Sequence, residues 1–236
     1  MANSQDKIFI RNYDDFKARL SEYVNRVINE VPSDNFEEAL IGYLVDLYTD
    51  SFYEELEYIL NELGLELDEV EYRNAQNSIN QSGFARSNYT RLKEIFASRK
   101  ADILSIRDEV VAEKGVLDQE EIDRRIVPII ELISVSEVHM AIEKASVETA
   151  KVLHHITGEV IYKRWNSVND ERTCPICRLL DGTRVPVGIS FIEGLDPEDD
   201  AYDIAVNYLS YTGGDFSYAH PRCRCWLTYE KEEVTL

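Results

Sequence analysis

Several features are missing from this sequence, and each absence excludes a class of protein. No apolar stretch approaches the ~18 residues that a membrane-spanning helix needs, and no positively charged opening precedes an apolar run. A Gly-rich phosphate loop, a Gly-x-Ser-x-Gly elbow and a His-Glu-x-x-His motif are also absent. We therefore expect a protein made in the cytoplasm, with no membrane association and none of these catalytic motifs.

Basic residues are scarce, because 25 Lys and Arg stand against 45 Asp and Glu and give a formal net charge of -20. A field of this sign repels phosphate and anionic lipid. Direct binding to duplex DNA is therefore disfavoured. Apolar residues are not scarce, since 44% of the chain is hydrophobic and 14 residues are Tyr. This composition is too rich in core-forming side chains for a disordered chain.

Cysteine is also rare, and its placement is uneven. All four cysteines lie between Cys174 and Cys225. In a reducing compartment such clustering indicates metal binding before disulfide formation. The alternatives are that the thiols stay reduced, or that a disulfide forms after release into an oxidising medium.

Most of the chain before residue 158 has the apolar periodicity of amphipathic helices. Apolar residues recur at spacings of three and four, so about two thirds of the chain is predicted to be helical. Gly64, Gly115 and Gly158 predict helix ends, and Pro128 predicts a kink or a break. The segment 81–83 predicts a loop. The predicted helices cover 16–31, 40–63, 92–110 and 122–153.

The pattern changes from Glu159, where a β-prone run containing Trp165 begins. Asp181-Gly182 predicts a hairpin between short strands, and Trp165 is expected to anchor the core of this part. We predict a mostly α N-terminal helical domain over residues 1–157, followed by a small α+β zinc-stapled module over residues 158–236.

Two Cys-containing motifs in this second part have the spacing of metal ligands. Thr173-Cys174-Pro175-Ile176-Cys177 places two thiolates as in a zinc knuckle, and His220-Pro221-Arg222-Cys223-Arg224-Cys225 repeats the gap and adds one Cys. Five candidates compete for the four positions of Zn²⁺, and the spacing does not decide which four bind. The candidate ligands are Cys174, Cys177, His220, Cys223 and Cys225.

The role predicted for this metal is structural. A catalytic zinc needs an open coordination position, but here the candidate ligands outnumber the four positions. The signature of zinc deaminases requires His-x-Glu, and neither His139 nor His154 nor His155 is followed by Glu at that spacing. We expect His139 on a helix surface and no catalytic residue.

The order of motifs in the second part resembles the Mu F-like head-morphogenesis family of tailed bacteriophages and prophages. The resemblance covers roughly residues 135 to 230, and His-Pro-x-Cys-Arg-Cys at its end is the most specific part. The segments that carry it are Tyr162-Lys163-Arg164-Trp165, Asp170-Glu171-Arg172-Thr173-Cys174-Pro175-Ile176-Cys177, Leu180-Asp181-Gly182 and His220-Pro221-Arg222-Cys223-Arg224-Cys225.

The resemblance implies a minor head (capsid) protein that acts in head morphogenesis and is not an enzyme. It implies portal-associated contacts, with the portal protein, the major capsid protein or both as partners, and a homo-oligomer is a further possibility. The residues 1–157 would form the assembly and portal-contacting domain. The expected location is the virion, in the head interior or portal region, and the host cytoplasm during assembly.

Two other classes of protein remain as alternatives. A metal-dependent nuclease of the HNH type often carries Cys-x-x-Cys knuckles beside a catalytic His, but using His220 as a ligand leaves no general base in the module. A zinc-ribbon regulator of transcription would need a basic face that the module lacks.

Overall fold

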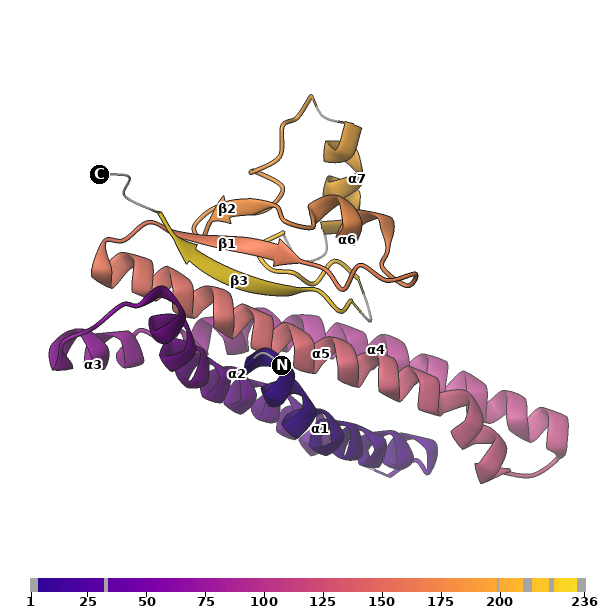
Figure 1. Ribbon diagram of the computed structural model, residues 1–236. Coiled ribbons are helices and arrows are strands. Elements are labelled where there is room, and N and C mark those ends of the chain that lie inside the picture. Colours follow the sequence, from indigo (N-terminus) through magenta and orange to yellow (C-terminus); the bar gives the residue numbers. More distant parts are fainter. Residues whose placement is uncertain (1–3, 32–33, 199, 210–213, 221–222, 233–236) are drawn as a thin grey trace. The chain divides into compact units, whose positions relative to one another are not determined.

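Seven helices and three strands make up the part of the chain that the computed structural model describes, which is residues 4–31, 34–198, 200–209, 214–220 and 223–232 (Figure 1). The described chain is thus mostly helical with one small antiparallel sheet, which confirms the predicted fold class in this coarse form. No helix among the described residues combines the length and low charge needed to cross a bilayer. In chain order the elements are α1 (Ser4–Ile28), α2 (Asp34–Leu63), α3 (Glu69–Asn77), α4 (Gln81–Lys114), α5 (Gln119–Thr157), β1 (Ile161–Asn166), α6 (Pro175–Leu180), β2 (Arg184–Pro186), α7 (Asp200–Leu209) and β3 (Trp226–Lys231).

Glycines end the long helices where the sequence predicted. Gly115 follows α4 with a φ of 73°, and its N–H donates to the Val111 carbonyl at 2.8 Å. Gly158 follows α5 with a φ of 72°. These left-handed conformations are strained for residues with a Cβ, so glycine is the residue that ends a helix in this way.

One local prediction about the helical part is wrong, the break that was one of two possibilities at Pro128 is absent, and one helix was missed. The segment 81–83 is the first turn of α4, because the Asn80 side chain accepts a hydrogen bond from the Gly83 N–H and caps the helix. Pro128 lies inside α5, which continues through it without a break. The helix α3 was not predicted, although Asp68 and Glu71 form a capping box at its start.

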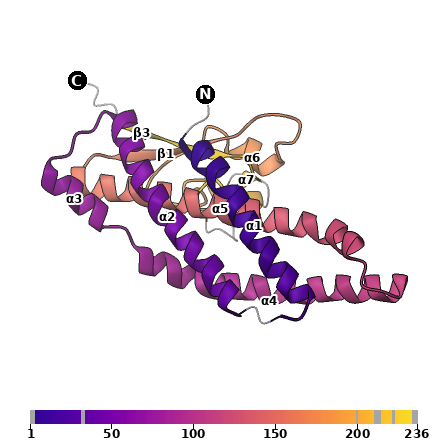
Figure 2. The same cartoon turned by 90° about the horizontal axis from the view of Figure 1, so that it is seen from below.

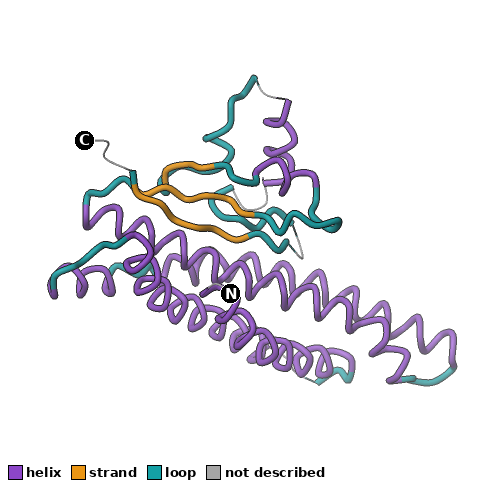
Figure 3. Tube along the Cα trace, viewed as in Figure 1, coloured by secondary structure: helices purple, strands orange, loops and turns teal. Residues whose placement is uncertain are grey.

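The sheet has the strand order β2-β1-β3, with both pairs antiparallel (Figure 3). The short strand β2 lies on one edge and β3 on the other, so β1 is central. Side chains of β1 alternate between buried and half-buried positions, as the twofold period of a strand requires. Asn166, the last residue of β1, pairs with Trp226, the first residue of β3. The segments that precede β3 and follow β1 therefore start from the same end of the sheet.

The sequence predicted that Asp181-Gly182 joins two strands as a hairpin turn, and this is wrong. These residues connect α6 to β2, because Cys174 to Leu180 form a capped helix and not a strand. Gly182 has a φ of 78°, so the turn itself is present. The Asp181 carboxylate accepts hydrogen bonds from Ser167 N at 2.7 Å and from Asn169 Nδ2 at 2.6 Å. Asp181 thereby fixes the loop between β1 and the first Cys motif.

The contacts within the described chain separate two compact units, and their limits differ from the predicted domains 1–157 and 158–236. Unit 1 comprises Met1–Ile8, Tyr48–Ile79 and His139–Leu236. Unit 2 comprises Phe9–Leu47 and Asn80–Val138. The helices α2 and α5 each contribute to both units, so residues 158–236 share their unit with parts of these two helices.

The buried core of unit 1 explains this division. It joins Leu56 and Leu60 of α2 and Leu153 of α5 with residues of the sheet and its loops. Trp165 is fully buried in this core and packs edge-on against Phe191 at a centroid distance of 5.2 Å, which confirms its predicted role as an anchor. Figure 2 shows α3 beside the C-terminal part of α2, within the same unit. Burial of these apolar side chains stabilises the sheet against the helices.

Unit 2 is a helical bundle with an apolar core and charged outer pairs. Phe16 and Leu20 of α1 and Phe96 of α4 are almost completely buried. At the start of α5, Glu121 accepts hydrogen bonds from Arg124 and Arg125, each at 2.6 Å. These guanidinium groups lower the pKa of Glu121 to about 2.

Candidate metal centre

The first Cys motif forms the N-terminus of α6. Cys174 is the N-cap residue, with a φ of -70° and a ψ of 161°, and Pro175 follows in the first turn. Proline suits this place because its missing N–H would have no partner within the helix. The Cys174 Sγ accepts a hydrogen bond from the Cys177 N–H at 3.4 Å. This knuckle turns both thiols toward the same side.

The second motif leads directly into β3. The Cys223 N–H donates to the His220 carbonyl at 3.0 Å, which turns the chain and brings the His220 ring close to the cysteines. Cys225 stands immediately before Trp226, the first residue of β3. Pro221 and Arg222 of this motif lie outside the described residues. Because β1 and β3 are paired, the two motifs meet at one end of the sheet although they are far apart in sequence.

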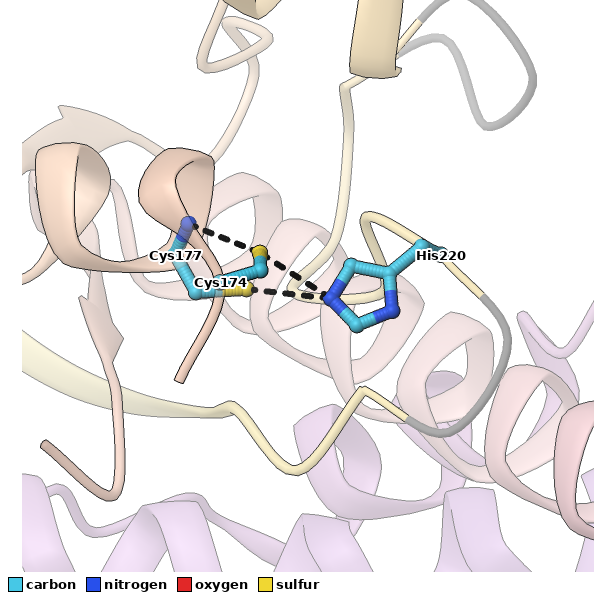
Figure 4. Close-up of side chains that lie close together, drawn as sticks. All are labelled: Cys174, Cys177 and His220. Atoms are coloured by element: carbon cyan, nitrogen blue, oxygen red, sulfur yellow. Dashed lines mark hydrogen bonds between the residues drawn. The ribbon is translucent and has the colours of Figure 1, made fainter. Parts of the chain in front are cut away.

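All five predicted ligands come together in two overlapping groups. Cys174, Cys177 and His220 form one group, and Cys177, Cys223 and Cys225 form the other. In each group the candidate ligand atoms lie within 4.8 Å of one another. Cys177 belongs to both. Figure 4 shows the first group, with the His220 ring pointing at the two thiols of α6.

Two distances between these atoms match those around a tetrahedral zinc ion. Zn–S bonds near 2.3 Å and Zn–N bonds near 2.0–2.1 Å place neighbouring ligand atoms at about 3.6–3.8 Å. The Cys177 Sγ lies 3.6 Å from the Cys223 Sγ and 3.7 Å from the His220 Nε2. The His220 Nε2 lies 3.1 Å from the Cys174 Sγ, which is shorter than this range. This donor set of four thiols and one imidazole is also the type that zinc prefers.

Burial differs between the donors. Cys177, Cys223 and Cys225 are buried, whereas Cys174 and His220 are partly exposed. A small open pocket reaches the cluster and is lined by Cys174, Cys177, His220 and Cys225. The cluster is therefore accessible to an ion from solvent on the side of His220, while Cys223 lies behind it.

The buried thiols perturb one another's protonation. Hydrogen bonding to the thiols of Cys177 and Cys225, and to the backbone amides of Ala219 and Cys225, lowers the pKa of Cys223 despite its burial. The hydrogen bond with Cys223, together with burial, raises the pKa of Cys177. Binding of a metal ion to this cluster would displace the protons of the thiols that coordinate it.

Trp165 places a buried indole N–H beside this cluster. Its indole N–H is buried without a hydrogen-bond partner of normal geometry. Hydrogen bonding to Cys177 and Trp165 lowers the pKa of Cys225, while Cys223 and burial raise it by more. A buried N–H left unpaired costs about 1–3 kcal/mol. A negatively charged Cys225 sulfur in a metal site would be a better acceptor for it than a neutral thiol.

An ion pair links the two Cys motifs outside the cluster. The Arg224 guanidinium donates two hydrogen bonds to the Asp170 carboxylate, at 2.7 and 2.6 Å. Asp170 stands in the loop before Cys174, and Arg224 stands between Cys223 and Cys225. Arg224 keeps the pKa of Asp170 well below its usual value. The bidentate geometry fixes the orientation of both segments.

The sequence identified the five donors but missed the side chains that support them. Asp170 and Arg224 occur in the quoted motifs, yet nothing in the spacing predicts that they pair. His139 is mostly buried, with 17% of its side chain exposed, so the prediction of a surface position is wrong. Its i, i+4 spacing to Glu143 on α5 is a signal that could have indicated a pair.

Comparisons with models of protein families, with curated proteins and with solved structures found no match.

Proposed function

We propose that this chain is a minor head protein of a tailed bacteriophage or prophage, and that it acts in head morphogenesis through contacts with portal or capsid subunits. In this proposal the protein is not an enzyme. The Cys/His cluster binds one structural Zn²⁺, which closes the end of the small sheet.

One observation carries the proposal. The four sequence segments that resemble the Mu F-like family contribute to one structural feature around the end of β1 and β3. Trp165 lies in the core beside the cluster, Asp181 holds the loop after β1, and Asp170 pairs with Arg224. Segments that together serve one structural purpose would be expected to meet in this way, which supports the resemblance.

The chemistry of the donors supports a structural zinc in this role. Zn²⁺ has no redox chemistry, and a set with four thiols and one imidazole can fill its four positions without leaving one for a substrate. Bound there, the ion would tie the start of α6 to the segment that leads into β3. The acidic net charge of -20 supports a function through protein contacts and argues against direct contact with DNA.

The proposal is tested in the phage or prophage whose genome encodes the chain. Purified heads should contain the protein, and cross-linking followed by mass spectrometry should join it to portal or capsid subunits. A strain from which its gene is deleted should produce heads with altered composition, DNA content or infectivity. Heads identical to the wild type in all three respects would contradict the proposal.

The purified protein tests the nuclease alternative. The metal-free protein, refilled with Zn²⁺ or Mg²⁺, is incubated with plasmid DNA. We expect no cleavage. Cleavage that disappears in a Cys177→Ser variant would support the HNH-type alternative and overturn the assignment as a non-enzymatic head protein.

A further inference from the structure

Two polar side chains of α5 reach the segment that carries the second Cys motif. His139 and Glu143 stand four residues apart, so they lie on the same face of this helix. We call this pair the α5 clamp. Both residues belong to unit 1, together with all five candidate ligands. Neither residue is itself a candidate ligand.

Glu143 holds the segment just before His220. Its side chain is almost completely buried, with 1% exposed. The Oε2 atom accepts hydrogen bonds from the Ser217 hydroxyl at 2.6 Å and from the Ser217 N–H at 3.3 Å. The Ser217 carbonyl in turn accepts a hydrogen bond from the Cys223 thiol at 3.2 Å. While Cys223 is protonated, a continuous chain of contacts therefore runs from α5 through Ser217 to a candidate ligand.

His139 contacts the same segment at two places, one before the candidate ligands and one among them. Its ring lies edge-on to Tyr218, at a centroid distance of 5.4 Å, and its Nε2 lies 3.6 Å from Glu143 Oε1. Burial lowers the pKa of His139, but Glu143, the charge of Cys223 and a hydrogen bond with the Cys225 backbone raise it by more. The imidazole thus interacts with Tyr218 before the ligands and with Cys225 among them.

We propose that His139 and Glu143 are positioning residues for the metal centre, which fix Ser217, Tyr218 and the Cys225 backbone and so set the places of His220, Cys223 and Cys225. This inference rests on the proposed metal site and extends it from the ligands to α5. The two Cys motifs of the site would then be positioned by different interactions. The first is fixed by the cap of α6 and the second by the clamp.

The physical reason is that partners of the ligands fix their orientation before the ion arrives. Loss of such an outer partner typically weakens metal affinity by about 10–100-fold, because the ligands then lose entropy on binding. A buried residue that merely contributes to packing would change the stability of the metal-free protein and leave the affinity unchanged. The two roles can therefore be separated.

A second buried carboxylate provides a matched control. Glu55 of α2 is fully buried in the same unit and accepts a hydrogen bond from the Ser146 hydroxyl at 2.9 Å. Ser146 is also joined to Tyr229 of β3, at 2.8 Å. Glu55→Ala therefore removes a comparable carboxylate and hydrogen bond without touching the clamp.

The experiment measures the affinity of the chain for Co²⁺ and for Zn²⁺. The visible absorption spectrum of thiolate-bound Co²⁺ reports the geometry of the ligands. Unfolding in the presence of a chelator gives the stability of each metal-free variant. Glu143→Ala should weaken binding by about 10–100-fold and alter the Co²⁺ spectrum. Glu143→Gln, whose amide oxygen can still accept from Ser217, should restore most of the affinity. Glu55→Ala should lower only the metal-free stability.

Equal affinities of wild type, Glu143→Ala and Glu55→Ala would overturn the clamp while leaving the metal site intact. So would equal losses in the two alanine variants. If Glu143→Ala does not fold, Ser217→Ala takes its place, and an unchanged affinity and Co²⁺ spectrum in that variant would also overturn the inference. A wild-type chain that binds neither ion would refute the metal site itself, which is a different result.

Discussion

Replacement of Cys177 by Ser should damage the metal site far more than the same change at Cys225. Both thiols are buried, so the two variants remove comparable groups. Cys177 belongs to both groups of candidate ligands. Without it the remaining donors fall into two pairs, Cys174 with His220 and Cys223 with Cys225. Without Cys225, Cys177 still stands 3.6 Å from Cys223 and 3.7 Å from His220.

The size of the effect follows from the free energy of zinc binding. Structural zinc sites contribute about 10–16 kcal/mol in small peptides, so an even division over four ligands gives about 2.5–4 kcal/mol for each. Since every 1.4 kcal/mol is tenfold, Cys177→Ser should weaken zinc binding by roughly 10²–10³-fold. Cys225→Ser leaves four donors, with Cys177 and its neighbours Cys223 and His220 among them, and its affinity should stay within about tenfold of the wild type.

Competition with a chromophoric chelator in reducing buffer measures both affinities. Far-ultraviolet circular dichroism of the same samples checks that each variant keeps its helices. Equal losses of affinity in Cys177→Ser and Cys225→Ser would refute the reasoning, because the two overlapping groups would then have no meaning for coordination.

Three further outcomes are expected. The double variant Cys174→Ser, Cys177→Ser should lose most of its metal and should be cut by limited proteolysis within 158–236. Most of the helical circular dichroism signal should persist. A double variant that keeps metal and resists cleavage would contradict this prediction. The wild type should be more stable than Glu121→Gln above pH ~4.5, and this difference should vanish as the pH falls toward 2, because the folded-state pKa of Glu121 is lowered to about 2. Equal denaturation midpoints for the two proteins at pH 7 would contradict this. Lys163 donates a hydrogen bond to the Asp215 carbonyl at 2.7 Å, and burial lowers its pKa from the ordinary 10.5 to about 8. Between pH 8 and 10.5 the unfolded state therefore binds more protons than the folded state, so the stability of the wild type should rise with pH over this range. This rise should be absent in Lys163→Met.

The long helices could be predicted because their apolar residues repeat with the period of a buried stripe. Phe16, Leu20 and Val24 are almost completely buried on α1, as this pattern requires. The helix α3 was missed because only Ala75 among its residues is buried, so periodicity carries little signal there. Its capping box was present in the sequence and would have been the better guide.

The limits of the two compact units could not be predicted from local pattern. The change of period near Glu159 marks where secondary structure changes, but it does not show which helical residues bury the new strands. The apolar stripe of α2 continues without interruption from Leu44 to Leu56, although the two residues belong to different units. Only the pairing of distant segments separates them.

The sequence predicted the ligands of the candidate site but not the residues that surround them. Cys and His at fixed spacings carry their own signal, because few other roles require that pattern. Glu143 and Ser217 carry none, since a helical Glu and a loop Ser are common on any surface. Their hydrogen bond depends on how the loop before His220 packs on α5, which is a property of the tertiary structure.

The metal content of this chain tests the account most directly. Protein purified under reducing conditions and supplied with zinc should contain close to one Zn²⁺ per chain by elemental analysis, and the double variant Cys174→Ser, Cys177→Ser should contain almost none. A wild-type chain that carries no zinc, iron or other transition metal would contradict the account at its centre.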